Sequence, residues 1–103
     1  MYSKGDVLIV NFPFSDLTNV KKRPIVVLAV KGEDVIGCAI TSNLEVDGIE
    51  LNNFAEGNLQ FKSKIKYWQI HTFLKEIVYK KVAKINKETY KELTGKINTL
   101  FSV

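Results

Sequence analysis

Three runs of apolar, largely β-branched residues follow one another within the first 42 positions, and only short segments connect them. The runs are Val7–Phe12, Ile25–Val30 and Val35–Thr41. Each is bounded by turn-forming residues and is too short for a typical helix, so each predicts a buried strand. The polar segment Lys31–Asp34 contains a glycine and predicts a hairpin. Because no connection has room for a crossover helix, we expect an antiparallel sheet.

The middle of the chain is less regular. Ile49–Leu51 predicts a short strand, whereas residues 52–57 have the composition of a turn. Ser63–Thr72 predicts a longer strand, and its alternation breaks at Tyr67–Trp68, which indicates a bulge or a change of face. Val78–Ile85 is compatible with a strand or a helix.

The last third of the chain predicts a helix from about Lys87 to Phe101. Asn86 is a favourable N-cap residue, and apolar residues recur at helical spacing after it. This apolar stripe consists of Tyr90, Leu93, Ile97, Leu100 and Phe101. It can pack on the sheet or on a partner chain, and both readings stay open. The fold class is mainly β with short α: a single domain spanning residues 1–103, with a small, strongly curved antiparallel sheet or barrel closed by a C-terminal helix.

Composition excludes several classes of protein. A hydrophobic fraction of 46% and a charged fraction of 25% are ordinary for a soluble globular domain. The sequence has no apolar stretch of the length that a membrane helix needs and no signal-peptide pattern, so we expect a cytoplasmic protein without a membrane partner. Cys38 is the only cysteine and His71 the only histidine, which argues against an internal disulfide and against a metal site, and we expect no cofactor.

The net charge of +4 is moderate and unevenly distributed. Cations gather at 21–23, at 62–66 and from residue 75 onward, whereas acidic residues concentrate between Glu33 and Glu56. This asymmetry suits a face that binds a polyanion, although a small basic excess often serves only solvation. The acidic, irregular stretch Glu45–Phe61 is expected to lie away from such a face.

The run Lys21, Lys22, Arg23 is the first candidate site. It ends a polar segment of about ten residues between two predicted strands, and Pro24 follows directly. Proline biases the preceding residue toward an extended backbone, so Arg23 should be held rigidly where the strand begins. A guanidinium in that position suits bidentate contact with a phosphate or stabilisation of charge in a phosphoryl transition state.

Thr41, Ser42 and Asn43 form the second candidate site. They end the third predicted strand with two hydroxyls and an amide, which are small groups able to meet an anion. The commoner use of such a sequence is a hydrogen-bonded turn. If the second and third strands pair as a hairpin, both candidate sites lie at the same end of the sheet.

His71 has no catalytic motif around it. A histidine within a sheet, hydrogen-bonded to a neighbour, is the more ordinary reading than a catalytic residue. The sequence also has no phosphate-binding glycine loop and no nucleophile elbow.

These segments together resemble the MazF/PemK family of toxins from bacterial toxin–antitoxin pairs. The resemblance is carried by Gly5–Asp6 ahead of an apolar strand, Phe12–Asp16, Lys22–Pro24, Val26–Leu28 and Ile40–Ser42, and then by the closing amphipathic helix. It covers essentially the whole chain. The motifs of the first 42 residues are specific, and the remainder matches by pattern.

The resemblance implies an SH3-like barrel that forms a homodimer and acts as a metal-independent, sequence-specific endoribonuclease on single-stranded RNA. In this family the ribose 2′-hydroxyl attacks, which leaves a 2′,3′-cyclic phosphate and a 5′-hydroxyl. The implied catalytic residues are Arg23 and Thr41. The implied RNA-binding residues are Lys21, Lys22, Ser42, Asn43, Asp16 and His71, and the segment 14–22 occupies the place of the one that borders the RNA groove.

The resemblance also implies partners. A cognate antitoxin would wrap a disordered tail around the dimer, and operator DNA would be bound only in complex with that antitoxin. His71 or Asp16 could supply the acid or base that some relatives carry; otherwise Arg23 and Thr41 would act by electrostatic stabilisation and positioning. Two alternatives stay open: a non-enzymatic barrel of the same superfamily that binds a protein target such as gyrase, and a degenerate barrel serving as an interaction module.

Overall fold

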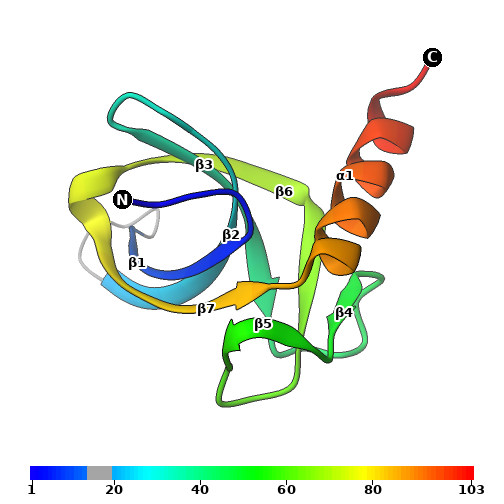
Figure 1. Ribbon diagram of the computed structural model, residues 1–103, viewed down its shortest axis with the longest axis horizontal. Coiled ribbons are helices and arrows are strands. Elements are labelled where there is room, and N and C mark those ends of the chain that lie inside the picture. The colour runs from blue at the N-terminus through cyan, green and yellow to red at the C-terminus, as the bar shows by residue number, and fades with distance from the viewer. Residues whose placement is uncertain (14–19) are drawn as a thin grey trace.

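A computed structural model describes residues 1–13 and 20–103 of the chain. Its elements run in the order strands β1 to β6, a 3₁₀ helix η1, strand β7 and helix α1 (Figure 1). Their bounds are β1 Asp6–Pro13, β2 Val20–Lys31, β3 Asp34–Thr41, β4 Ile49–Leu51, β5 Phe54–Gly57, β6 Ser63–Leu74, η1 Lys75–Ile77, β7 Val78–Ile85 and α1 Lys87–Phe101.

The strands form one strongly curved sheet in the order β4-β6-β3-β2-β1-β7-β5, and every pairing is antiparallel. Strands β2 and β3 form the predicted hairpin, with Lys31 paired to Asp34. The sheet curls into a nearly closed barrel with α1 against its side (Figure 1). The mainly β fold class and the antiparallel sheet are therefore confirmed.

Strand β2 is longer than the hydrophobic pattern predicts. It begins at Val20, so Lys21, Lys22 and Arg23 lie within a strand rather than at the end of a loop. The strand is extended because β1 continues alongside it, pairing Asn11 with Lys22. The apolar run of this strand begins only at Ile25. The strand nevertheless starts at Val20, because backbone hydrogen bonds do not depend on apolar side chains.

Pro24 lies inside β2 and pairs with Ile9 of β1. On the other side of β2, pairing with β3 begins only at Ile25. A proline is tolerated at this position because the ladder to β3 has already ended there. The predicted turn at 52–57 is also wrong, since Phe54–Gly57 forms strand β5 against β7.

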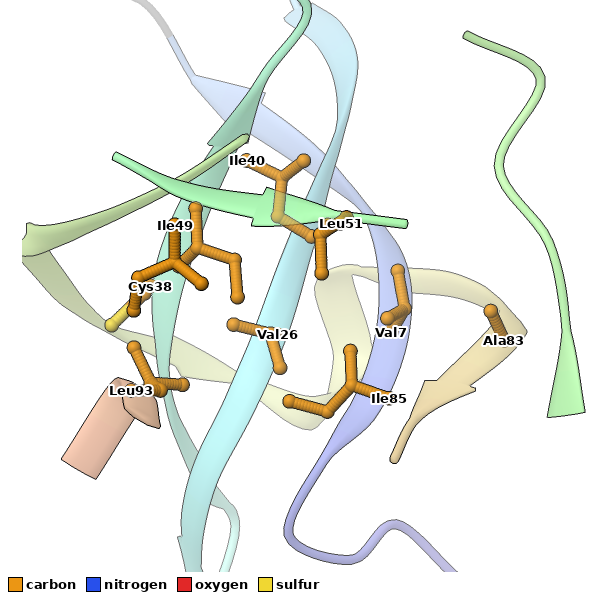
Figure 2. Packing of buried hydrophobic residues seen from close by; sticks show 10 residues of the cluster. Val7, Val26, Cys38, Ile40, Ile49, Leu51, Ala83, Ile85 and Leu93 are labelled. Atoms are coloured by element: carbon orange, nitrogen blue, oxygen red, sulfur yellow. The ribbon is translucent and has the colours of Figure 1, made fainter. Parts of the chain in front are cut away.

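Two hydrophobic clusters pack on opposite faces of the central strands. The larger one gathers around Val7, Val26 and Ile65 and is closed by Leu93 of α1 (Figure 2). The smaller one gathers around Leu8, Ile25 and Val27 and is closed by Phe73. Because alternate residues of β1 and β2 enter different clusters, these strands are apolar on both faces, which explains their unbroken hydrophobic runs.

Strand β6 contains the bulge that the sequence indicates. Cys38 pairs with Ile70, but the next residue, Ala39, pairs with Lys66, so residues 67–69 are extra on the β6 side. The bulge lets the two halves of this long strand serve different parts of the barrel.

Helix α1 has the predicted bounds. The Asn86 side chain accepts a hydrogen bond from the Thr89 backbone N–H at 2.8 Å, as an N-cap residue does. The apolar stripe divides into two parts: Leu93 is fully buried in the larger cluster, whereas Leu100 and Phe101 are 48% and 70% exposed. The first part caps the monomer, and the second part faces outward.

A buried carboxylate ties the N-terminus to β7. Asp6 is 1% exposed and accepts hydrogen bonds from the Ser3 N–H at 2.8 Å and from Lys84 Nζ at 3.2 Å. Lys81 Nζ lies 3.2 Å from the same oxygen as Lys84. Burial by itself would raise the pKa of Asp6, but these hydrogen bonds and the lysine charges outweigh it and hold the pKa below 3.8, its ordinary value.

Within the described part of the chain, no helix is both long enough and apolar enough to cross a membrane.

Candidate nucleic-acid interface

The predicted site residues of segments 21–23 and 41–43 gather at one end of the sheet. Strand β1 ends there, β2 begins, β3 ends and β6 begins, because neighbouring strands run in opposite directions. The two candidate sites, 21–23 and 41–43, are therefore brought together, since β2 and β3 are neighbours in the sheet.

Arg23 and Thr41 each lie two residues beyond the last pair of the β2–β3 ladder, Ile25 with Ala39. The same antiparallel register, continued by two residues, would place Arg23 opposite Thr41. Pairing with the outer strands matches Arg23 to Val10 and Thr41 to Lys64. Because directly opposed residues share a face of the sheet, these side chains project on the same side as Ile25.

The turn after β3 holds the hydroxyl of Thr41 in place. Thr41 Oγ1 accepts a hydrogen bond from the Asn43 N–H at 3.1 Å, and Asn43 Oδ1 accepts one from the Glu45 N–H at 3.1 Å. The ordinary reading of this segment, a hydrogen-bonded turn, is thus confirmed. A hydroxyl oxygen that accepts a hydrogen bond still has its own proton to donate, so the turn fixes the Thr41 hydroxyl without using its proton.

A groove of about 560 Å³ opens at the same end of the barrel. Its walls are apolar at Ile9, Pro24, Ile40, Leu59, Phe61 and Val82. Three lysines and four uncharged polar residues complete the lining: Lys21, Lys22, Lys80, Ser42, Asn58, Gln60 and Ser63. No acidic residue is among the described residues of this lining, so its electrostatic character is basic.

Arg23 and Thr41 flank the groove but are not among its lining residues. Lys22, Pro24, Ile40 and Ser42 belong to the groove, whereas the residues between them in sequence do not line it. This follows from the alternation of side chains along a strand. Three predicted RNA-binding residues, Lys21, Lys22 and Ser42, are therefore in the groove, and the two predicted catalytic residues flank it.

Residues 58–61 form one wall of the groove, although the sequence predicted that this segment lies away from a polyanion-binding face. These residues lie within the acidic stretch Glu45–Phe61. Strand β5 pairs with β7 and so carries the following segment back over the barrel end. Lys80 of β7 was also missed. One feature of the sequence could have indicated the 58–61 wall: the apolar Phe61 stands among polar residues, directly ahead of lysines at 62, 64 and 66.

Lys22 is held by an aromatic ring. Its Nζ lies 3.8 Å from the centre of the Tyr79 ring, and Lys80 Nζ lies 5.6 Å from the same centre. Such contacts are attractive because the ring face is electron-rich. Tyr79 thus draws two of the groove's lysines together at its rim.

His71 lies in an aromatic cluster. Its ring centre is 5.3 Å from that of Phe12 and 5.8 Å from that of Phe73. It pairs with Gly37 and so projects on the same face as Arg23 and Thr41. Asp16, the other candidate acid or base, lies outside the described residues.

The groups with shifted pKa values serve the core rather than the groove. Burial raises the pKa of the Cys38 thiol to about 12, and burial also raises the pKa of Tyr90. The Tyr90 hydroxyl donates a hydrogen bond to the Leu28 carbonyl at 2.9 Å, which docks α1 on β2. Within residues 1–13 and 20–103, no cluster of three or more histidine, cysteine or acidic residues is arranged to hold a metal.

Comparison with known families identifies the chain. Residues 3–101 match the profile of the family described as PemK-like, MazF-like toxin of type II toxin–antitoxin system. This chain belongs to that family. Comparison with curated protein sequences gives no match.

Solved structures share the fold of this PemK-like, MazF-like chain at low sequence identity. The MazE–MazF complex (Form-II) from Deinococcus radiodurans matches with a TM-score of 0.77 at 16% identity, over 96% of this chain and 94% of that chain. MazF (Form-I) from the same organism matches with a TM-score of 0.73 at 17% identity, over 99% of this chain and 97% of that chain. Mycobacterium tuberculosis toxin MazF-mt6 matches with a TM-score of 0.72 at 17% identity, over 93% of this chain and 95% of that chain. The neighbours thus confirm a MazF-like fold over essentially the whole chain.

Proposed function

We propose that this toxin is a metal-independent endoribonuclease that cleaves single-stranded RNA through attack by the 2′-hydroxyl. The observation that carries the proposal is that the neighbouring strands β2 and β3 bring Arg23 and Thr41 to the same end of the barrel, where a groove with a basic lining opens. Membership of the toxin family supports the same activity.

The chemistry assigned to these residues is a phosphoryl transfer. The 2′-oxygen forms a bond to the neighbouring phosphorus, the bond from phosphorus to the 5′-oxygen breaks, and the products are a 2′,3′-cyclic phosphate and a 5′-hydroxyl. The proton lost by the 2′-hydroxyl is balanced by the proton gained by the departing oxygen. The planar guanidinium of Arg23 would donate two hydrogen bonds to the phosphorane oxygens, and the Thr41 hydroxyl would donate a third.

The groove is suited to the rest of the substrate. Its lysines would neutralise backbone phosphates on either side of the reacting one, while its apolar walls would receive unpaired bases. An RNA strand lying along the ends of β2 and β3 would touch both the groove and the Arg23–Thr41 pair. Ser42 and Asn43 would meet the same strand at the turn after β3.

Two protein partners belong to the proposal. An antitoxin would neutralise the toxin, as the MazE–MazF complexes of the structural neighbours suggest, and operator DNA would be bound only by the joint complex. A second copy would form a homodimer, with Leu100 and Phe101 in its interface because they are the apolar residues of α1 that the monomer leaves exposed. Light scattering on an active preparation should give twice the single-chain mass of 11.7 kDa; a clean single-chain mass would refute the dimer.

The activity is tested by incubating the purified protein with a long RNA in EDTA and mapping the cut ends. We expect cuts at a short recurring motif, with cyclic phosphate and 5′-hydroxyl ends. A matched substrate with 2′-deoxyribose at the cleaved position should stay intact. Cutting of the deoxy substrate would contradict the mechanism. Growth arrest without any RNA cleavage would instead favour the alternative in which the barrel binds a protein target.

A further inference from the structure

Phe61 is an exposed aromatic residue on the wall of the basic groove. Its side chain is 68% exposed, although it lines the groove beside Leu59 and Ser63. Exposing a phenylalanine to water is unfavourable, so an exposed ring at a concave charged site points to a ligand that covers it.

The segment that carries Phe61 is anchored on both sides. Before it, Gly57 has a φ of +63°, and a Cβ at that position would clash with the Val82 carbonyl oxygen, so the close approach to β7 requires glycine. Leu59 then packs against the larger hydrophobic cluster. After Phe61, the buried Ser63 donates a hydrogen bond from its hydroxyl to the Phe61 carbonyl at 2.8 Å. The backbone of Phe61 is thus positioned while its ring is left uncovered.

The charges around the ring select the kind of ligand. Lys21, Lys22 and Lys80 also line the groove, and Tyr79 holds two of these lysines near one another at the rim. An apolar ring beside several cations matches the two chemical parts of a nucleotide, a flat base and a charged phosphate. A purely apolar partner would leave the lysines without a function, and a free phosphate would leave the ring bare.

We propose that Phe61 is a stacking platform for one unpaired base of the RNA and that Gln60 beside it reads an edge of that base. The inference rests on the proposed function and assigns it a substrate-positioning and specificity-determining residue. The base inserted here is separated from its neighbours in the strand, which bends the RNA backbone toward the lysines. A glutamine amide offers both a donor and an acceptor, so it suits recognition of a base edge.

The test uses the cleavage motif found by end mapping, synthesised with 2′-O-methyl riboses so that it binds but is not cut. Affinity is measured for the wild type and for Phe61→Ala, Phe61→Leu and Phe61→Tyr. Loss of one stacked base typically weakens binding by about 5- to 150-fold. We expect that loss for the alanine and leucine variants, whereas the tyrosine variant should stay within about threefold, because tyrosine keeps the ring. Leu74→Ala, which removes an exposed apolar side chain outside the groove, is the control and should bind as the wild type does.

A second measurement reports stacking itself. The fluorescent base 2-aminopurine is placed at each position of the motif in turn, and its quenching on binding is recorded. One position should be quenched by the wild type and by Phe61→Tyr but not by Phe61→Leu. In cleavage assays Phe61→Ala should raise KM while kcat stays within about threefold, since the residue does not touch the reacting phosphate.

The outcomes separate this inference from the activity on which it rests. If the wild type cleaves RNA and Phe61→Ala or Phe61→Leu binds equally well, the stacking platform is refuted and the endoribonuclease stands. If the wild type neither binds nor cleaves RNA, both proposals are refuted. Equal quenching by the leucine variant would reduce the role of Phe61 to apolar contact and would overturn stacking.

Discussion

The ammonium group of Lys22 lies 3.8 Å from the centre of the Tyr79 ring, so a residue of β7 positions a cation of β2 across the intervening strand β1. Both side chains are largely exposed, and exposed contacts of this kind contribute about 0.5–1 kcal/mol. The contact therefore orients the lysine at the rim of the groove more than it stabilises the fold.

Tyr79→Leu should weaken binding of non-cleavable RNA by about two- to fivefold, because Lys22 then loses the ring that holds it near the groove. Fluorescence anisotropy at fixed salt measures the change. Tyr79→Phe keeps the ring and should bind as the wild type does. Equal losses in the two variants would assign the effect to the hydroxyl and contradict the cation–π explanation.

Arg23→Ala should lower kcat by about two to three decades, which is the usual cost of removing one electrostatic contact to a transition state. Arg23→Lys should not restore activity, since lysine lacks the planar fork that can contact two phosphate oxygens. The control is Lys21→Ala, which removes a groove cation and should change KM more than kcat. Near-normal cleavage by Arg23→Ala, with the fold intact by circular dichroism, would contradict the catalytic role. It would mean that the cations at 21–23 serve only to keep this surface solvated.

Thr41→Val keeps the shape of the side chain and removes its hydroxyl, so it should abolish cleavage while leaving RNA binding measurable. The matched variant is Ser42→Ala. Because Ser42 lines the groove, its loss should affect RNA binding more than the chemical step. Single-turnover rates at saturating RNA separate the two effects. If Ser42→Ala were the more damaging change for the rate, the catalytic role would belong to the next residue along the strand.

Asp6→Asn should destabilise the fold by about 1–3 kcal/mol at neutral pH, because a buried acceptor loses its charge while Lys81 and Lys84 keep theirs. The pKa of Asp6 is lower in the folded state than its ordinary value of 3.8, so its stabilisation is complete above about pH 5 and is lost as the pH falls through 3.8 and below. Urea denaturation across this range should therefore show a steeper loss for the wild type than for the variant. Glu56→Gln, which changes an exposed partner of Lys81 at 3.5 Å, is the control and should cost less than about 1 kcal/mol.

Cys38 should resist thiol reagents in the folded protein. Burial raises the pKa of this thiol to about 12, and its Sγ lies 3.7 Å from the Tyr67 carbonyl oxygen, so very little reactive thiolate exists at pH 8. Labelling with a chromogenic disulfide reagent should be slow in buffer and rapid in denaturant. A variant with an added exposed cysteine, Ser102→Cys, should react at once at one site per chain. Rapid reaction of the wild type would contradict the buried position of Cys38.

Local sequence patterns were sufficient for most of the fold. Alternation, turn residues and the Asn86 cap are short-range signals; they predicted the hairpin of β2 and β3, helix α1 and a bulge or change of face at Tyr67–Trp68, where β6 has its bulge. They failed where pairing rather than hydrophobicity extends a strand. The first residues of β2 and the whole of β5 are strands because a neighbouring strand lies beside them, and no local pattern reports that neighbour.

The candidate site divides in the same way. The sequence by itself predicted that the segments around Arg23 and Thr41 come together, because a hairpin places the start of its first strand beside the end of its second. Only the tertiary structure decided that these two residues flank the groove while Lys22 and Ser42 line it, since the register of three strands sets which side chains enter it. Only the tertiary structure could also bring Phe61 and Lys80 to that groove. Pairing of β5 with β7 carries Phe61 there, and pairing of β7 with β1, which sets Lys80 against Ile9, places Lys80; both pairings join segments that are far apart in the sequence.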